Sequence, residues 1–128
     1  MAIIICDIDD TLLRAGTSPI EKTVEWINAR AGKYTIVLVT GRPTSARSET
    51  VSQLKRAGVK YNRLILNPYG TSKTADHKYE TAMRLKKTSR VVLAIDNNAT
   101  MRAAYEKAGV KSIHPSDLSD NMLKTVII

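Results

Sequence analysis

Residues 1–16 read MAIIICDIDDTLLRAG, in which an apolar run passes directly into three aspartates. An unbroken apolar run of this length is typical of a strand that is covered on both faces of a sheet. Carboxylates crowded at the end of such a strand repel one another unless a cation lies among them. We therefore expect residues 3–7 to form a buried strand that delivers Asp7, Asp9 and Asp10 to a cationic site. Asp7 and Asp9 are two residues apart, so on an extended backbone their side chains would point to similar sides.

The rest of the chain alternates between strand patterns and helical patterns. Further strands are expected at residues 34–40, 63–66, 90–96 and 111–114, and helices after residue 18 and over residues 44–57, 73–87 and 98–108. Repeated strand–helix units with buried strands predict an α/β fold. The expected architecture is a Rossmann-like three-layer sandwich, with a mainly parallel sheet, helices on both faces and residues 1–128 in one domain.

Local patterns predict several details of these elements. The sequence SPIE is a capping box in which Ser18 is the N-cap of the first helix. Val51 and Leu54 are expected to face inward from the second helix, because they are three residues apart. A last helical turn or two is expected at 116–124, and residues 125–128 have the composition of an edge strand.

The composition is that of a soluble globular protein, with 43% apolar and 25% charged residues. No apolar run approaches the roughly 18 residues of a membrane span, so we expect a cytoplasmic protein without membrane contact. Cys6, the only cysteine, lies in the first apolar run and is expected to be a buried small residue rather than a reactive thiol. The net charge of +8 favours polyanionic partners such as nucleic acid, although a solvated basic surface has the same composition. The sequence leaves the oligomeric state open.

Polar and charged side chains gather where the predicted strands end. Besides the aspartates of the first strand, these are Thr40, Gly41 and Arg42 after the second strand, Asp96 and Asn97 after the fourth, and Lys73 and Lys78 near the start of the third helix. The carboxyl ends of parallel strands meet at one edge of a sheet, where ligands bind. Hard oxygen donors at such an edge suit Mg²⁺.

Such a site can transfer a phosphoryl group. One carboxylate can attack phosphorus, and a second can hold a proton for the leaving group. A metal ion and a lysine then neutralise the phosphate oxygens, and Thr40 can bind another oxygen. Taken singly, each feature has a structural explanation: an Asp pair can cap a turn, Asp96 and its neighbours can cap a helix, and Lys78 can be a solvated helix residue. Their conjunction, each at the end of a strand or helix, favours catalysis.

With these motifs the whole chain resembles the haloacid dehalogenase (HAD) superfamily of phosphatases. DIDDTL at 7–12 is similar to the first motif of that family, IVLVTGRP at 36–43 to the second, Lys78 to the third and Asp96 to the fourth. The resemblance implies a Mg²⁺ cofactor and a phosphorylated substrate. The resemblance also implies roles for single residues. Asp7 would be the nucleophile that becomes an aspartyl-phosphate and Asp9 the general acid/base, with Thr40 and Lys78 completing the catalytic set. The residues implied to contact substrate are Thr11, Gly41, Arg42 and Lys73. Those implied to hold the metal are Asp7, Asp9 (through its backbone carbonyl), Asp96 and Asn97.

The chain departs from the pattern of that family at two positions. Asp10 stands where the family most often has Gly, and Asn97 stands where many relatives have a second Asp, which would weaken metal binding. The lysine of the third motif can be matched by Lys73 or Lys78, of which we prefer Lys78 for its place one turn into the helix. His77, next to it, is expected on the surface of that helix.

The intervals between the motifs have room for a flap, helices and strands but not for the cap domain of many relatives. The resemblance therefore implies an open site, which in that family accepts large substrates or is closed by neighbouring subunits. Within the superfamily the chain is similar to the 3′-phosphatase domain of phage-type polynucleotide kinases, through GTSKTADHKYE at 70–80 and LAIDNNATMRAAYEKAGV at 93–110. This implies a 3′-phosphate on a nucleic-acid end or a nucleotide as substrate. The alternatives are a phosphatase of small nucleotides or sugar phosphates, and an inactive module that only binds phosphorylated ends.

Overall fold

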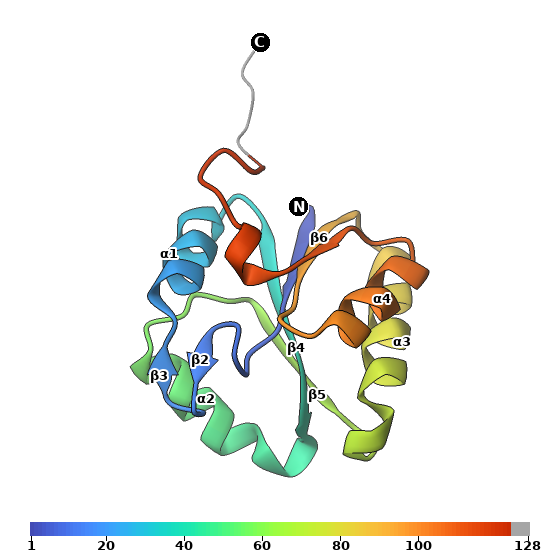
Figure 1. Ribbon diagram of the computed structural model, residues 1–128, viewed down its shortest axis with the longest axis horizontal. Coiled ribbons are helices and arrows are strands. Elements are labelled where there is room, and N and C mark those ends of the chain that lie inside the picture. Colours follow the sequence, from blue (N-terminus) through green and yellow to red (C-terminus); the bar gives the residue numbers. More distant parts are fainter. Residues whose placement is uncertain (124–128) are drawn as a thin grey trace.

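The computed structural model describes residues 1–123, and a five-stranded sheet forms its centre (Figure 1). Strand β1 (Ile3–Cys6) lies in the middle, between β4 (Thr35–Pro43) and β6 (Val91–Ile95). The outer strands are β5 (Arg63–Asn67), beside β4, and β7 (Ser112–Ile113), beside β6. All neighbouring strands pair in parallel. The predicted parallel α/β sheet is confirmed.

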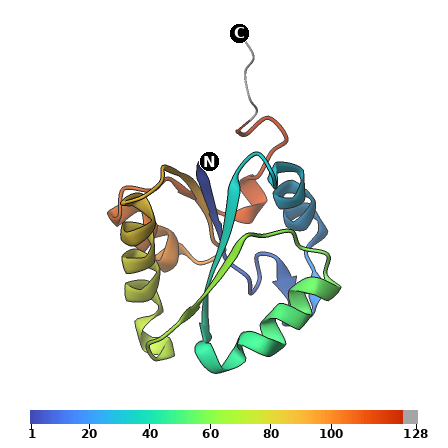
Figure 2. The same cartoon turned by 180° about the vertical axis from the view of Figure 1, so that it is seen from behind.

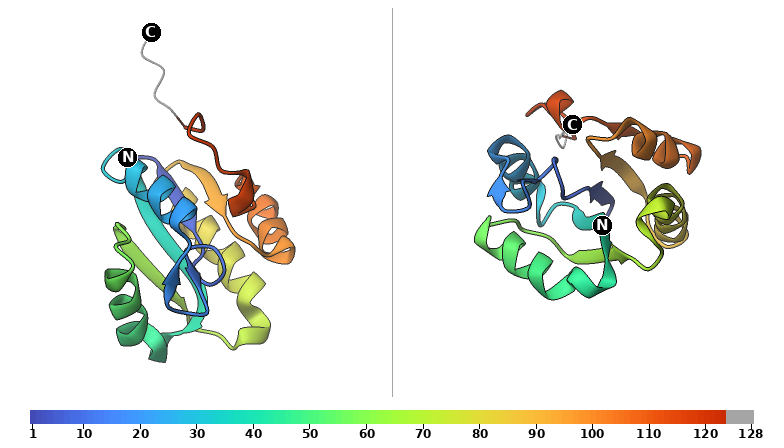
Figure 3. Two further views of the ribbon diagram at one scale, coloured as in Figure 1. Left: turned by 60° about the vertical axis from the view of Figure 1, so that its left-hand side comes forward. Right: turned by 60° about the horizontal axis from the view of Figure 1, so that its bottom comes forward.

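Helices cover both faces of this sheet, as the view from behind and the view from below make clear (Figures 2 and 3). One face carries α1 (Glu21–Arg30) and α2 (Arg47–Arg56), and the other carries α3 (Thr74–Lys86) and α4 (Ala99–Lys107). Alternate residues of β1 serve the two cores: Ile4 and Cys6 pack in the core under α1 and α2, and Ile3 and Ile5 pack in the core under α3 and α4. This alternation explains why the first strand is apolar throughout, and the three-layer prediction is confirmed.

A small antiparallel hairpin follows β1. It consists of β2 (Leu13–Arg14) and β3 (Ser18–Pro19). The predicted N-cap role of Ser18 is wrong, because Ser18 pairs with Arg14 in this hairpin and Ile20 is the residue before α1. The Ile20 N–H donates instead to the Leu12 carbonyl at 2.8 Å. The hairpin and α1 fill the interval between β1 and β4, so the described chain has no cap domain inserted there.

Two further details differ from the sequence prediction. Val51 is 40% exposed rather than inward-facing, and Thr50 and Leu54 are the buried residues of α2. Thr50 and Leu54 are four residues apart and share a face, and Thr50 can be buried because its hydroxyl has a partner in Arg42. In place of the helical turns predicted at 116–124, the structure has a short 3₁₀ helix, Pro115–Asp117, followed by turns. The edge strand predicted at 125–128 lies outside the described residues.

Two further 3₁₀ helices of the same length come before α-helices: Thr44–Ala46 precedes α2, and Thr71–Lys73 precedes α3. Cys6 is fully buried, as predicted.

No helix within residues 1–123 is both long and apolar enough to cross a membrane.

Candidate active site

The candidate site lies at the edge of the sheet where the parallel strands end. Asp7 follows the last residue of β1, and its N–H donates to the Ile95 carbonyl of β6 at 2.9 Å. Asp96 follows Ile95 directly, so the ladder between β1 and β6 places the two aspartates side by side. The C-terminal half of β4 supplies Thr40 from the other side. Because β1 lies between β4 and β6 and all three strands are parallel, their carboxyl ends bring the first, second and fourth sequence motifs to one edge of the sheet, as predicted.

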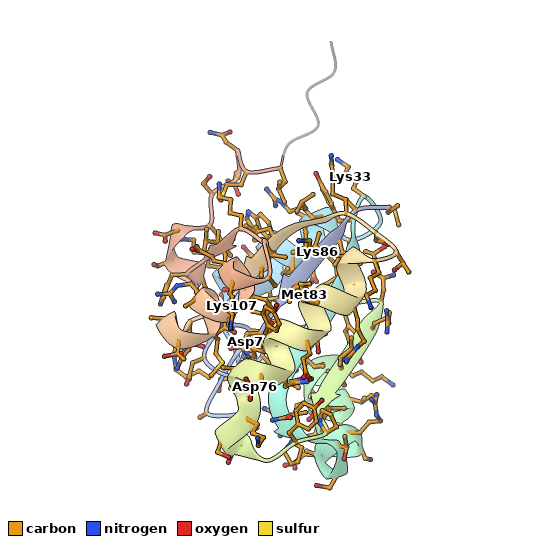
Figure 4. The ribbon with its side chains drawn as sticks, turned by 90° about the vertical axis from the view of Figure 1, so that its right-hand side faces the viewer. Asp7, Lys33, Asp76, Met83, Lys86 and Lys107 are labelled. Carbon is orange, nitrogen blue, oxygen red and sulfur yellow. The ribbon has the colours of Figure 1, made fainter. Side chains whose placement is uncertain are left out.

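Lys78 of α3 bridges the two buried aspartates. Its Nζ donates to Asp7 Oδ1 at 3.0 Å and to Asp96 Oδ2 at 2.5 Å. The side chains of Lys78, Asp7 and Asp96 are 3%, 9% and 1% exposed, so this is a buried cluster of two negative charges and one positive charge. In the side view Asp7 lies behind α3, whose outer face carries Met83 and Asp76 (Figure 4). The reading of Lys78 as a solvated helix residue does not hold.

Burial and the neighbouring charges shift the pKa values of this cluster. Burial raises the pKa of Asp7 to about 6, with a further rise from the charge of Asp96 and a partial compensation by Lys78. Burial by itself lowers the pKa of Lys78, but the charges and hydrogen bonds of Asp7 and Asp96 outweigh it, and the pKa is raised. Lys78 is therefore an ammonium at neutral pH, and Asp7 is ionised above about pH 6. The cluster retains one uncompensated negative charge.

Oxygen atoms converge on the other side of Asp7. Thr11 donates from Oγ1 to Asp7 Oδ2 at 3.1 Å, and the Asn97 N–H donates to Thr11 Oγ1 at 3.2 Å. The end of the Asn97 side chain faces Asp7 Oδ2 and the Asp9 backbone carbonyl; with its amide nitrogen turned inward it donates to them at 3.0 and 3.1 Å. A carboxylate, a backbone carbonyl and a side-chain amide thus surround one point.

This donor set fits a hard divalent cation. With the amide turned the other way, the Asn97 oxygen would join the Asp7 carboxylate and the Asp9 carbonyl as oxygen ligands of the kind that Mg²⁺ prefers. The uncompensated negative charge next to it favours a cation as well. Both oxygens of Asp96 accept hydrogen bonds within the protein, Oδ1 from the Asn98 N–H at 3.0 Å and Oδ2 from Lys78. Within residues 1–123, no three His, Cys, Asp or Glu side chains cluster as a metal site.

The side chain of Asp9 points elsewhere. Its two oxygens accept from Arg42 Nε at 3.0 Å and Arg42 Nη2 at 2.7 Å, in a bidentate pair. The expectation that Asp7 and Asp9 point to similar sides is wrong, because β1 ends at Cys6 and the chain turns at once. Asp10 in this turn has φ +60°, a left-handed conformation that Gly and Asp tolerate better than most residues. That conformation explains how Asp can stand where the resembling family most often has Gly.

Thr40 and Gly41 lie in the C-terminal half of β4, the strand beside β1. Thr40 is fully buried, and its Oγ1 accepts from the Arg42 N–H at 3.1 Å. A Cβ on Gly41 would lie 2.9 Å from Thr74 Cγ2 at the start of α3, so no larger residue fits without movement. Lys73, by contrast, is exposed and precedes α3, and no side-chain contact joins it to the aspartates. Of the two candidate lysines, Lys78 is the one that the structure brings to Asp7 and Asp96.

Sequence reasoning missed several side chains around the site. His77 is 1% exposed rather than on the surface, because both it and Lys78 face the sheet from the first turns of α3. Its Nε2 has no hydrogen-bond partner within residues 1–123, and burial lowers its pKa. Thr50 and Gln53 of α2 accept hydrogen bonds from Arg42. Neither residue belongs to a motif, and the only signal that could have found them is their position eight and eleven residues after Arg42 on the helix that follows.

Asn98 has the capping role that was the alternative for the whole Asp96 segment. Its Oδ1 accepts from the N–H groups of Thr100 and Met101 at the start of α4. Asp96 itself faces Lys78 and is not the cap.

Comparison with known proteins places the chain in a family. Residues 4–116 match the haloacid dehalogenase-like hydrolases. The chain belongs to this family. The family prediction made from the four motifs is thereby confirmed. In the described residues, a hairpin and α1 are the elements between β1 and β4.

Two solved structures are similar to the hydrolase. One is a chain in the structure of the Pnkp1/Rnl/Hen1 RNA repair complex, with a TM-score of 0.68 and 20% identity, covering 88% of this chain and 42% of that one. The other is NagD from E. coli K-12, with a TM-score of 0.41 and 19% identity, covering 88% of this chain and 43% of that one. The hydrolase thus spans less than half the length of either, and the first likeness establishes a shared fold. No protein with a curated description matches the sequence.

Proposed function

We propose that this hydrolase is a Mg²⁺-dependent phosphomonoesterase that works through a phosphoryl group on Asp7. The observation that carries the proposal is the buried cluster in which Lys78 contacts both Asp7 and Asp96 at the carboxyl edge of the sheet. A carboxylate held rigidly by a lysine and a threonine is a suitable nucleophile toward phosphorus. A cluster that keeps a negative charge despite burial also favours a cation beside it.

The reaction has two steps. Asp7 receives the phosphoryl group in the first and releases it in the second, while Asp9 first donates a proton and then accepts one. An oxygen of Asp7 attacks phosphorus, the bond from phosphorus to the ester oxygen breaks, and that oxygen takes a proton from Asp9. A water molecule then attacks the phosphorus of the aspartyl-phosphate and gives its proton to Asp9, the bond to Asp7 breaks, and inorganic phosphate leaves. Both side chains return to their first state.

The remaining residues hold the phosphoryl group during these steps. Lys78 places a positive charge beside Asp7, and the hydroxyl of Thr40 and the backbone of Gly41 lie at the end of the neighbouring strand. Asp7, the Asp9 carbonyl and Asn97, with Asp96 beside them, would hold Mg²⁺. When bound, the ion would neutralise phosphate oxygens and reduce the repulsion between them and Asp7.

We infer further that the substrate is a 3′-phosphate on a nucleic-acid end or a nucleotide. The net charge of +8 favours a polyanion. The absence of an inserted cap in the described chain leaves the sheet edge open to a large substrate. The similar fold of a chain from an RNA repair complex makes RNA ends worth testing beside DNA ends.

The test is phosphate release in the presence of Mg²⁺ from a 3′-phosphorylated oligonucleotide, its 5′-phosphorylated twin, and free 3′- and 5′-nucleotides. Asp7→Asn serves as the blank, since it removes the nucleophile and keeps the shape. We expect fastest release from the 3′-phosphorylated end. Release from free nucleotides alone would make the hydrolase a small-molecule phosphatase, and turnover by Asp7→Asn would refute the mechanism.

A further inference from the structure

Arg42 is held from two sides at the mouth of the site. Its Nε and Nη2 donate to Asp9, at 3.0 and 2.7 Å, and its Nη1 donates to Thr50 Oγ1 at 3.1 Å and to Gln53 Oε1 at 2.6 Å. One edge of the guanidinium thus faces the site, and the other faces α2. Gln53 is itself oriented by Glu49, whose Oε1 accepts from Gln53 Nε2 at 3.3 Å.

The two sides differ in how firmly they are fixed. The Arg42 side chain is 14% exposed, whereas the Asp9 side chain is 49% exposed and belongs to a turn. Thr50 is fully buried on a helix that packs on the sheet, and it cannot follow a movement of Asp9. If the pair separates, Arg42 therefore remains on α2 and Asp9 is the residue that moves.

The proposed reaction requires this separation. A carboxylate paired at both oxygens with one guanidinium faces that guanidinium, so Asp9 must turn away from Arg42 before it can present an oxygen to the leaving group. Once Asp9 turns away, the Nε and Nη2 edge of Arg42 is a free fork of two donors. Such a fork matches two oxygens of a phosphate as well as it matches a carboxylate.

We propose that Gln53 and Thr50 are positioning residues, which hold the Arg42 guanidinium so that its fork is presented to a phosphate of the substrate when Asp9 leaves it. The inference rests on the proposed function, because the phosphate is that of the proposed substrate. Arg42 without these two acceptors would keep its charge but would follow Asp9 or spread over several rotamers. Substrate binding would then weaken, while the chemical step at Asp7 would be little affected.

The test compares Gln53→Met, which removes the acceptor and keeps the length, with Gln53→Glu, which keeps an acceptor oxygen. Ser52→Ala, an exposed neighbour on the same helix, is the matched control. We expect Gln53→Met to raise KM for the phosphorylated oligonucleotide by about tenfold with kcat within about twofold, as for loss of one hydrogen bond to a charged group. Ser52→Ala should stay near the parent values, and Gln53→Glu, which keeps an acceptor for Arg42 but loses the hydrogen bond to Glu49, should have a KM below that of Gln53→Met. Thr50→Val, which keeps the buried shape, should repeat the effect of Gln53→Met.

A double-mutant cycle separates positioning from a general structural effect. In an Arg42→Met background, Gln53→Met should cause no further rise in KM, because the side chain that it positions is gone. An equal rise in both backgrounds, or an unchanged KM in Gln53→Met, would overturn the inference. Unfolding midpoints of all variants verify that each is folded.

Binding of inorganic phosphate, measured by calorimetry with Mg²⁺, separates this inference from the proposed function. Phosphate binding that weakens about tenfold in Gln53→Met, in a protein that hydrolyses none of the substrates, would support the positioning role and refute the phosphatase. If the parent hydrolyses the substrate and Gln53→Met leaves both KM and phosphate affinity unchanged, the phosphatase is supported and the positioning role is refuted. A parent that binds no phosphate would overturn the positioning role.

Discussion

Replacing Asp7 by Asn should stabilise the metal-free protein while it abolishes turnover. Asp7 is 6% exposed, and it shares one lysine with Asp96, so its charge is only partly compensated. Asn has nearly the same shape and carries no charge. The charge of Asp7, which the proposed reaction needs, thus lowers the stability of the metal-free fold.

The magnitude follows from the pKa of Asp7. Burial, the first cause, and the charge of Asp96 raise it from 3.8 to about 6, against the attraction of Lys78. A shift of about two units corresponds to about 3 kcal/mol of destabilisation of the ionised form at neutral pH. Asn resembles the neutral form, so we expect a gain of about 2 to 3 kcal/mol, which is a rise of about 6 to 12 °C in the unfolding midpoint of a domain of this size.

The pH dependence has a definite sign. Because the folded pKa of Asp7 is raised, its ionisation destabilises the folded state fully above about pH 6 and not at all below the unfolded value of 3.8. The parent protein should therefore lose the stability contributed by this group as the pH rises from about 4 to 6. The difference between Asp7→Asn and the parent should be largest at pH 7 and should shrink towards pH 4.

The midpoints of the parent and of Asp7→Asn between pH 4 and 7 are measured by thermal unfolding followed by circular dichroism, in buffer with a chelator and again with Mg²⁺. Asp9→Asn is the matched control, since the Asp9 side chain is half exposed and paired with Arg42, and its loss should give no gain. Mg²⁺ should raise the midpoint of the parent more than that of Asp7→Asn. An Asp7→Asn midpoint at or below that of the parent at pH 7, without metal, would refute the argument that burial of this charge is unfavourable.

Three other substitutions follow from contacts in the same region, each measured by thermal unfolding at pH 7. Lys78→Met should destabilise the protein by about 3 to 5 kcal/mol, because two buried carboxylates lose their only cationic contact within residues 1–123, and an unchanged midpoint would contradict the buried cluster. Gly41→Ala should cost about 1 to 3 kcal/mol through the 2.9 Å approach of the new Cβ to Thr74, and Thr74→Ala in the same chain should restore most of it if that contact is the cause. Tyr105→Phe should raise stability by about 1 kcal/mol, since the buried hydroxyl has no partner within residues 1–123, and a loss would mean that it has one.

The part of the site that was predictable from the sequence is the part set by the sheet. Asp7, Thr40 and Asp96 each follow or end an apolar run, and parallel strands bring such positions together whatever the details of the loops. Lys78 was predictable as a companion, but its preference over Lys73 depends on which face α3 turns to the sheet. Lys73 ends the 3₁₀ helix that precedes α3 and is exposed, whereas Lys78 lies in the early turns of α3 and is buried against the sheet.

What could not be predicted depends on contacts between distant segments. The sequence SPIE satisfies the local pattern of a capping box, but Ser18 pairs with Arg14 in a hairpin, and a local pattern cannot choose between the two. Thr50 and Gln53 have no distinguishing composition, and their role emerges only when α2 is laid against the end of β4. His77 is buried beside Lys78, which an amphipathic pattern with one buried face does not anticipate for two consecutive polar residues.

The two carboxylates of the first motif end in opposite environments, and this division agrees with the roles proposed for them. Asp7 is buried and held at both oxygens, by Lys78 and by Thr11, as a nucleophile that must not move requires. The Asp9 side chain is half exposed on a turn and, within residues 1–123, is held by Arg42 alone, as a group that must reach first a leaving oxygen and then a water molecule requires. The residue between them, Ile8, is fully buried, and its carbonyl accepts the N–H groups of the turn that follows, which fixes the point at which the chain changes direction. A shift of that turn by one residue would place Ile8 in the environment of one of the aspartates, so the buried Ile8 is needed to keep the two environments apart.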